Sequence, residues 1–395
     1  MTNSTKTSLS VLILTKWYPN KFDPQLGVFI QKQAKALSLW CPVSLIYICP
    51  DPLLTSQLVA EVKITGQLLE ICIYFKKRKG ILGILIHPVL YLMALLKGLK
   101  LIRQNKRKIN FINATILNRT GIIALFGRVF FGLPYVVTEH WTGYGNGRFN
   151  QKSVLQRWLA KVVCRYADAI IVVSKGLKAS MQKVGIAGNF VIIPNVVERV
   201  DLKEKPTTNF KPTSIQFLSV ADLEDNHKNI SGVLKAFKAI SHSFPGSVYH
   251  IIGDGSDKER LETLTKSLDF AKGQVVFHGR QPNAYVYEMM KTVDFVVINS
   301  HYETFSVVAA EALANGKPVV TTRCGGPEDF ISEHNGIIVP PGDHEALIRA
   351  LKQMMSDYRK YDAESLNNGV AEVYGYARIG ETIYNLLGIF IVQNG

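Results

Sequence analysis

The residues best suited to chemistry lie between 298 and 327, in the segment INSHYETFSVVAAEALANGKPVVTTRCGGP. A predicted strand over 294–298 leads into a loop that carries Glu303, and a predicted helix begins near Ser306. The first amides of such a helix point back toward the strand end and favour a phosphate. Glu303 and Glu311 flank that anion site, and a carboxylate accepts hydrogen bonds from a pair of sugar hydroxyls. The combination suits a diphosphate between two sugars, as in a nucleotide sugar.

Two alternatives apply to these carboxylates: Glu303 as an ordinary loop acid, and Glu311 as an exposed helix position. The apolar surroundings of Glu311, VVAAEALA over 307–314, argue against simple exposure. No D-x-D motif follows a hydrophobic strand in the sequence, which argues against a divalent cation that holds the diphosphate. We therefore expect no metal site and no cofactor.

Several separated segments resemble family 4 glycosyltransferases, and the resemblance covers nearly the whole chain. The segment ETFSVVAAEALANGKPVV from Glu303, followed by CGGPE, is similar to the E-x7-E region of that family. The resemblance implies the GT-B fold, an α/β architecture of two Rossmann-like doubly wound domains that face a central cleft. It also implies a retaining enzyme that transfers a sugar from a nucleotide-sugar donor.

The same resemblance assigns roles in the first domain and in the nucleobase loop. YPNKFDPQLGVFI from Tyr18 resembles the family's first loop, in which Gly27 lets the backbone approach the donor phosphates. TEHWTGY over 138–144 resembles the segment with the active-site histidine, so His140 is expected to position the donor sugar. FHGR over 277–280 resembles the base-contacting loop, which includes Gly279 and Arg280.

For the donor, the resemblance implies that Lys228 and the amides of Phe305, Ser306 and Val307 hold the diphosphate. Glu303 is then expected to bind donor-sugar hydroxyls as part of the catalytic site, and Glu311 to bind the ribose. The leaving phosphate is expected to help deprotonate the acceptor during same-face attack.

Two positions depart from the family pattern. Asp222 stands where an arginine is expected, and a carboxylate there would repel a diphosphate. Either Asp222 points elsewhere and another cation, such as Arg280 or Arg323, replaces the arginine, or donor binding is weaker. Ser306 replaces the usual glycine, and we expect its hydroxyl to cap the helix.

Alternating strand and helix patterns must position these residues. Residues 1–195 are expected to form an acceptor-binding domain, 196–213 a linker, and 214–375 the nucleotide-sugar domain, with a helix near 376–395 packing back on the first domain. Five scattered cysteines without a C-x-x-C pair indicate a reducing compartment.

Charge differs sharply between the two halves of the chain. Residues 1–190 hold 26 Lys/Arg and 6 Asp/Glu, a net charge of +20, and the remainder carries −5. The apolar stretch 81–96 is shorter than a spanning helix requires and contains a proline. Basic residues flank it, so the segment 76–108 is expected to dock on an anionic membrane. A cytoplasmic protein, peripheral at the inner face of the membrane, would then meet a glycan or a polyprenyl-diphosphate-linked saccharide acceptor during O-antigen or capsule assembly.

Three other functions remain open from sequence. A nucleotide-sugar epimerase of the same architecture would act without an acceptor. A basic nucleic-acid-binding protein would use the positive first half, although no recognition helix, zinc finger or RNP-like strand is present, so no nucleic-acid partner is expected. An inactive glycosyltransferase-like scaffold would follow if Asp222 abolishes donor binding. UDP- and GDP-sugars are both compatible with the motifs.

Overall fold

The computed structural model describes residues 9–117, 119–203 and 214–394, apart from the side chains of 81, 82, 84 and 392–394. The chain divides into two compact units. Unit 1 contains Met1–Val173, Lys178–Val196 and Tyr376–Gly395, and unit 2 contains Ser174–Leu177 and Val197–Gly375. Part of the expected linker, 204–213, lies outside the described residues.

Unit 1 is built on an eight-stranded sheet with the order β3-β4-β2-β1-β5-β6-β7-β8. Every neighbouring pair is parallel except β3 and β4. Its interior strands are fully buried and mostly apolar, which is typical of a sheet covered on both faces. Its elements are β1 (Val11–Thr15), α1 (Val28–Leu37), β2 (Val43–Asp51), β3 (Leu58–Thr65), β4 (Leu68–Lys76), α2 (Gly80–Gln104), β5 (Phe111–Thr115), α3 (Arg119–Phe131), β6 (Tyr135–Glu139), a 3-10 turn (Thr142–Tyr144), α4 (Val154–Tyr166), β7 (Ala169–Val172), α5 (Lys175–Lys183), β8 (Phe190–Ile192) and α13 (Tyr376–Asn394).

The alternation of strands and helices in the sequence predicts a parallel sheet, and the antiparallel hairpin of β3 and β4 was not predicted. Strand β3 is largely exposed, and its apolar and polar residues do not form the continuous apolar run that indicates a buried strand. Strand β4 is buried along almost its whole length. The hairpin widens the sheet on the side that α2 covers.

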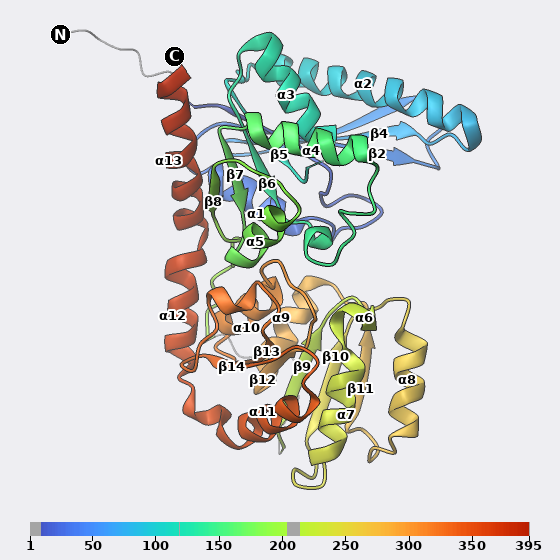
Figure 1. Cartoon of the computed structure of the whole chain (residues 1–395), viewed down its shortest axis with the longest axis vertical. Helices are drawn as coiled ribbons and strands as arrows, with labels where there is room; N and C mark the ends of the chain where they lie inside the picture. The colour runs from blue at the N-terminus through green and yellow to red at the C-terminus, as the bar shows by residue number, and fades with distance from the viewer. Residues whose placement is uncertain (1–8, 118, 204–213, 395) are drawn as a thin grey trace, which may run out of the picture. The chain divides into compact units, whose positions relative to one another are not determined.

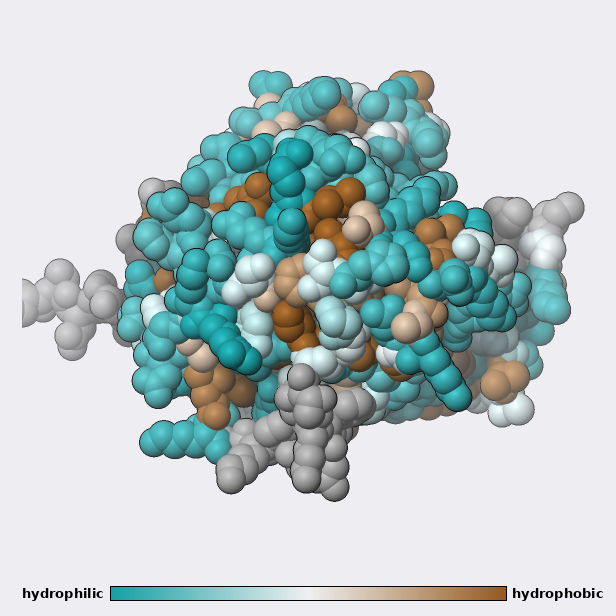
Figure 2. Space-filling model, turned by 90° about the horizontal axis from the view of Figure 1, so that it is seen from below, coloured by the Kyte–Doolittle hydropathy of each residue, from teal (hydrophilic) through white to brown (hydrophobic). Residues whose placement is uncertain are grey.

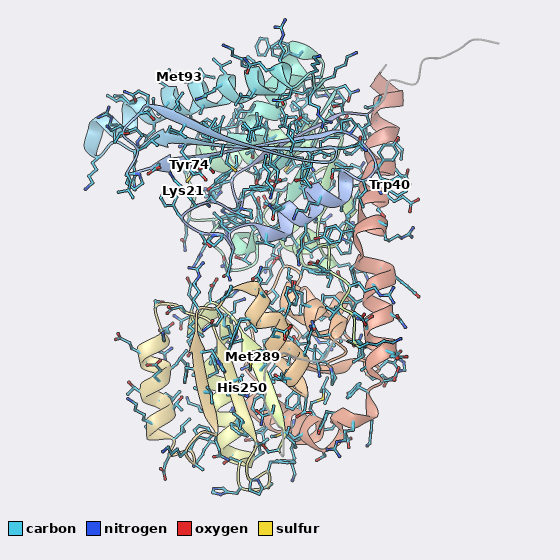
Figure 3. All side chains as sticks on the ribbon, turned by 180° about the vertical axis from the view of Figure 1, so that it is seen from behind. Lys21, Trp40, Tyr74, Met93, His250 and Met289 are labelled. Carbon is cyan, nitrogen blue, oxygen red and sulfur yellow. The ribbon has the colours of Figure 1, made fainter. Side chains whose placement is uncertain are left out.

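The C-terminal helix α13 packs against α1 in unit 1. The contact is close because a Cβ on Gly380 would lie 2.1 Å from the carbonyl oxygen of Ala36. Beside it, the rings of Trp40 and Tyr384 stack with centroids 6.1 Å apart, and Figure 3 shows Trp40 next to this helix.

Helices α2, α3 and α4 follow successive strands in one direction across the sheet, so right-handed crossovers place them on the same face (Figure 1). Their outer sides are unusually apolar. Among the described residues, 24 large hydrophobic side chains are exposed, 23 of them in unit 1 and 14 on these three helices. Met93 on α2, labelled in Figure 3, is one of them.

Helix α2 is longer than the apolar stretch recognised in the sequence. It continues to Gln104, and Leu85–Gln104 is long and apolar enough to cross a membrane by length and composition. The expectation that this segment is too short for a membrane span is therefore wrong as a statement about length. Only 28% of its most apolar window is buried. However, α2 packs against β2 and β4, and it connects β4 to β5 within one sheet.

Unit 2 holds a six-stranded, fully parallel sheet with the order β11-β10-β9-β12-β13-β14. Phe217 lies at the centre of its core, stacked between Tyr249 and Phe295 at centroid distances of 4.6 and 5.1 Å. The face in Figure 2 is mostly hydrophilic, with hydrophobic side chains in small separate patches. The elements are β9 (Gln216–Val220), α6 (Asp225–Lys228), α7 (Ile230–Ile240), β10 (Val248–Ile252), α8 (Lys258–Ser267), β11 (Val275–Gly279), α9 (Asn283–Thr292), β12 (Phe295–Ile298), α10 (Val307–Ala314), β13 (Val319–Thr322), a 3-10 turn (Pro327–Asp329), β14 (Gly336–Val339), α11 (His344–Asp357), a 3-10 turn (Tyr358–Lys360) and α12 (Ala363–Tyr374).

Candidate active site

The carboxyl edge of the unit 2 sheet collects most of the residues singled out for donor binding. Strands β9 and β12 are neighbours and parallel, so the loops after them meet at the same edge. A cavity of about 60 Å³ opens there. Lys228, Glu303, Ser306 and Val307 all contribute to its wall.

Lys228 and Glu303 form an ion pair in this cavity, with Nζ 2.6 Å from Oε1. Their side chains are 19% and 13% exposed. Burial opposes charge on both groups, but each partner overrides it: the pKa of Lys228 lies above its usual value and that of Glu303 below. The Ser300 hydroxyl also donates to Glu303 Oε1, at 2.7 Å. Both groups are therefore ionised at neutral pH, and the sequence did not predict that they pair with each other.

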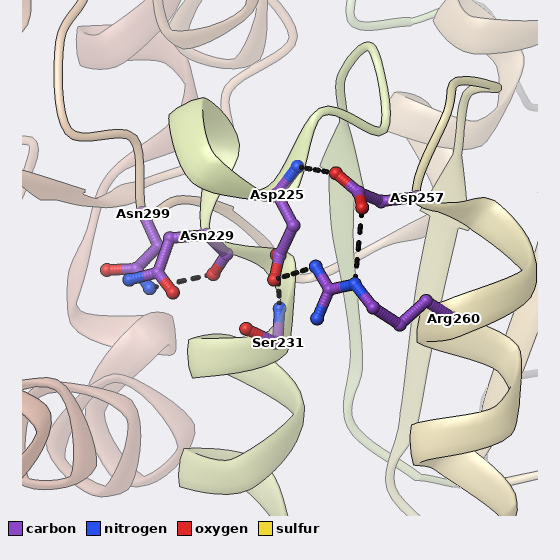
Figure 4. A network of polar contacts seen from close by, with 6 residues as sticks. All are labelled: Asp225, Asn229, Ser231, Asp257, Arg260 and Asn299. Carbon is purple, nitrogen blue, oxygen red and sulfur yellow. Dashed lines mark hydrogen bonds and ion pairs between the residues drawn. The ribbon is translucent and has the colours of Figure 1, made fainter.

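A network of polar contacts fixes the segment that carries Lys228 (Figure 4). Asp225 accepts hydrogen bonds from the amide of Ser231 and from the guanidinium of Arg260, both at 2.8 Å. Although burial acts to raise the pKa of Asp225, these contacts hold it below its usual value. At the other end, the Asn299 amide donates to the backbone carbonyl of Asn229, at 3.0 Å. The loop after β12 and the α6 segment are thus tied together.

The start of α10 brings backbone amides to the same cavity. Phe305 is 2% exposed and its ring packs against Phe330 and Tyr374, so these contacts hold the loop between β12 and α10 in place. Gly326 passes so close that a Cβ there would lie 2.5 Å from the amide nitrogen of Phe305. Amides in the first turn of a helix have no intrahelical acceptor, so they remain able to bind an anion.

Ser306 does not act as the predicted cap. Its φ of 67° is left-handed, and its side chain makes no capping hydrogen bond. The backbone at this position has the conformation that glycine adopts without strain, which explains why a glycine is usual there. The amide of Ser306 keeps its place at the cavity, while the hydroxyl contributes no cap.

We predict that Ser306→Gly raises the free energy of unfolding by about 1 kcal/mol, because it relieves a left-handed non-glycine residue. Urea unfolding at neutral pH measures this. Ser306→Ala, which keeps the strain and loses only the hydroxyl, should unfold at nearly the wild-type urea concentration. A less stable Ser306→Gly variant would show that the hydroxyl stabilises the loop.

The other residues predicted in unit 2, namely Glu311, Gly279, Arg280 and Asp222, are not among the residues that line this cavity. Glu311 on α10 is half-buried and accepts a 2.6 Å hydrogen bond from the Tyr287 hydroxyl. Gly279 ends β11 with φ 66°, and Arg280 follows it, exposed, at the same sheet edge. Asp222 is exposed, and its charge acts on Lys228. The positive charge of Lys228 is therefore favoured by two carboxylates, of which Glu303 is its ion-pair partner.

In unit 1, Gly27 and His140 lie at the corresponding edge of the other sheet. Gly27 precedes α1 with φ 66°, and a Cβ there would lie 2.6 Å from the Trp17 carbonyl oxygen, so only glycine fits. His140 follows β6 and is 5% exposed, and its ring centroid lies 4.6 Å from that of Phe29. Burial lowers its pKa to about 3, so its ring is neutral. Neither ring nitrogen has a hydrogen-bond partner among the described residues, although an unpaired buried polar group costs free energy.

Glu139 is a functional candidate that sequence reasoning missed. It is fully buried, and its carboxylate accepts hydrogen bonds from the backbone amides of Leu117, His140 and Trp141, at 2.9, 2.9 and 3.0 Å. The Tyr144 hydroxyl donates a fourth, at 3.0 Å. Glu139 thus joins the loops after β5 and β6. An acid directly after a buried strand, beside His140, was the available signal.

No group of three or more His, Cys, Asp or Glu side chains is arranged to hold a metal ion in the described ranges.

The fold and this site define a GT-B glycosyltransferase architecture, and comparison with known proteins gives the family. Residues 200–369 match the model described as Glycosyl transferases group 1, and residues 75–199 match Glycosyltransferase Family 4. The chain belongs to these glycosyltransferases. It is 25% identical over 214 residues to the lipopolysaccharide 1,6-galactosyltransferase of Salmonella typhimurium, a match that covers 53% of this chain and 58% of that protein. The chain thus spans little more than half the length of this curated relative.

Solved structures with low sequence identity share the fold. Sucrose-phosphate synthase from Thermosynechococcus elongatus has a TM-score of 0.75 at 19% identity, covering 98% of this chain and 100% of the other. The HepE protein of Anabaena, solved with UDP and glucose, has a TM-score of 0.70 at 16% identity, covering 96% and 99%.

Proposed function

We propose that this protein is a retaining glycosyltransferase that moves a sugar from a UDP- or GDP-sugar to a glycan or lipid-linked saccharide in surface polysaccharide biosynthesis. The observation that carries the proposal is the unit 2 cavity, where Lys228, Glu303 and the first amides of α10 converge. The similarity to a lipopolysaccharide galactosyltransferase supports the polysaccharide, and HepE, solved with UDP and glucose, supports a nucleotide-sugar donor.

In this proposal, the diphosphate binds to the amides of Phe305, Ser306 and Val307 and to Lys228. An ammonium has three donors, and the ion pair with Glu303 occupies one of them. Lys228 can therefore contact a phosphate oxygen without leaving Glu303. No metal takes part in this proposal, because amides and the ammonium stabilise the negative charge of the leaving group.

During transfer, the bond between the anomeric carbon and the phosphate oxygen breaks, and its electron pair leaves with the nucleoside diphosphate. The acceptor hydroxyl attacks the same face of the anomeric carbon, and its proton passes to the departing phosphate oxygen. Glu303 binds donor-sugar hydroxyls, and the neutral ring of His140 hydrogen-bonds the same sugar. Glu311 binds the ribose hydroxyls.

A panel of UDP, GDP, ADP and CDP in thermal unfolding tests nucleotide binding. A nucleotide at 100 times its dissociation constant raises the free energy of unfolding by about 2.7 kcal/mol. We expect one nucleotide to raise the midpoint of the wild type and to lose this effect in Glu311→Ala. Tyr287→Phe is the matched control, since it removes the hydrogen bond to Glu311 but keeps the carboxylate. If no nucleotide shifts the wild-type midpoint, the inactive-scaffold alternative replaces this proposal.

The proposal also places the protein at the inner face of the cytoplasmic membrane, bound through a docking surface formed by α2, α3 and α4. Residues 71–167 contain 17 Lys/Arg and one acidic residue, Glu139. Because Glu139 is buried, no carboxylate of this stretch offsets the basic charge at the surface. Exposed apolar side chains among such cations suit an anionic membrane.

We predict that Phe130→Asp with Phe131→Asp lowers binding to vesicles of anionic phospholipid by about tenfold or more. Both rings are exposed, at 65% and 71%, so the fold should tolerate the change. Leu53→Asp, at an 81% exposed position outside the docking surface, is the control. Equal sedimentation of all three proteins with vesicles would contradict the docking surface, and salt-dependent DNA retention without vesicle binding would favour the nucleic-acid alternative.

A further inference from the structure

A second, larger cavity lies in unit 1, and none of its lining residues belongs to unit 2. Its volume is about 280 Å³, and it opens where β1, β5 and β6 end, between α3 and α4. Its lining includes two lysines, two tryptophans and two aliphatic side chains: Lys16, Lys152, Trp17, Trp141, Ile122 and Leu159. The sequence motifs assign none of them a role.

Two ammonium groups belong to this cavity without a carboxylate partner. In the part of the chain that the structure describes, neither Lys16 nor Lys152 forms an ion pair or a side-chain hydrogen bond. Burial lowers the pKa of Lys152. The negative charge of Glu139 acts to raise this pKa, and the positive charge of Lys16 acts to lower it further. Lys16 is exposed and Lys152 is half-buried, and two neighbouring cations that repel each other favour a shared anion.

Two indole rings line the same cavity and are held in place. The Trp141 ring lies over Gly143, where a Cβ would come within 2.0 Å of it, and the Lys152 ammonium lies 4.3 Å from its centroid. The Trp17 ring meets Phe29 edge to face at 6.4 Å, with the Lys16 ammonium 6.0 Å from its centroid. Rigid aromatic faces beside cations suit a sugar ring that carries a phosphate.

Apart from Gln156, the remaining wall is apolar, and it continues onto the docking surface. Ile122 on α3 lines the cavity and is itself 43% exposed, and Leu159 lines it from α4. The exposed Phe126 lies one helical turn further along α3. A ligand with a hydrocarbon tail could therefore place its polar end in the cavity and its tail along these helices.

We propose that this cavity binds the phosphate-bearing saccharide end of an amphiphilic acceptor. The ammonium groups of Lys16 and Lys152 contact the phosphate or diphosphate, and the rings of Trp17 and Trp141 pack on the adjoining sugar. This inference rests on the proposed function, since it names the acceptor class of that transferase.

The test is a binding titration of the full chain with farnesyl diphosphate and with inorganic pyrophosphate, with excess UDP present. The double variant Lys16→Gln/Lys152→Gln is compared with the wild type. The control is Lys63→Gln/Lys183→Gln, which removes two exposed lysines of unit 1 outside the cavity. Loss of two charge-assisted contacts should weaken farnesyl diphosphate binding about 100-fold in the cavity variant alone. Pyrophosphate, which lacks the tail, should bind more weakly than farnesyl diphosphate to the wild type.

Equal affinity of the wild type and the cavity variant for farnesyl diphosphate, or no binding at all, would overturn the inference. Pyrophosphate that binds as tightly as farnesyl diphosphate would overturn its amphiphilic part. UDP affinity, measured on the same samples, should not differ among the three proteins. If none of UDP, GDP, ADP and CDP binds while farnesyl diphosphate does, the proposed function fails and the cavity assignment stands.

Discussion

Lys228→Met should destabilise the protein by about 3 kcal/mol, because it leaves the Glu303 carboxylate largely buried without its cation. The double variant Lys228→Met/Glu303→Gln should recover much of that loss, since both charges are then gone. Nucleotide affinity should behave differently and stay about 100-fold below wild type in both variants. Urea unfolding and nucleotide titration on the same proteins separate the two effects.

Lys21→Met is the matched control for this experiment. Lys21 pairs with the buried Asp51 at 2.5 Å in unit 1, and its ammonium lies 4.4 Å from the Tyr74 ring centroid (Figure 3). Its loss should lower stability and leave nucleotide affinity unchanged. If Lys228→Met/Glu303→Gln binds nucleotide as the wild type does, Lys228 is only structural and the proposed diphosphate contact is wrong.

Glu139→Ala should lower the free energy of unfolding by on the order of 5 kcal/mol, because four buried donors lose their acceptor at once. The three amides lie on the loops after β5 and β6, so both His140 and Trp141 lose their anchor. Glu139→Gln keeps one acceptor oxygen and should lose less. Denaturant unfolding measures both variants.

Glu333→Ala is the control for this second prediction, since that carboxylate is 90% exposed and a surface change of this kind costs little. A Glu139→Ala protein within about 1 kcal/mol of the wild type would mean that water or a neighbouring side chain replaces the carboxylate. In that case Glu139 would not organise the loops.

Much of the fold could be predicted from the sequence because parallel strands in the interior of a sheet are buried on both faces and therefore mostly apolar. The sequence predicts five strands in the second unit, over 215–220, 247–253, 274–278, 294–298 and 318–322. All five are present as β9 to β13, and β14 was missed. Strand β3 was missed because it is largely exposed, so its sequence lacks the continuous apolar run by which a buried strand is recognised. The exposed apolar sides of α3 and α4 were missed for the opposite reason, since apolar helix residues are ordinarily taken as core.

The candidate site was predicted in outline but not in its contacts. Motifs indicated that Lys228 and Glu303 would reach one sheet edge, yet their pairing depends on side chains 75 positions apart. The left-handed backbone at Ser306 was visible only indirectly, through the glycine that the family usually has there. The unit 1 cavity joins residues from 16 to 163, and no local pattern marks it.

Transfer of a labelled sugar tests the central claim most directly. The protein is incubated with UDP- or GDP-sugars labelled in the sugar, together with membrane extract as acceptor. We predict that label from one donor moves to the organic-extractable or polymeric fraction, with equal release of nucleoside diphosphate, and that Glu303→Gln abolishes both. Label recovered as an epimer of the donor, or a donor that is bound and left unchanged, would contradict the assignment as a glycosyltransferase.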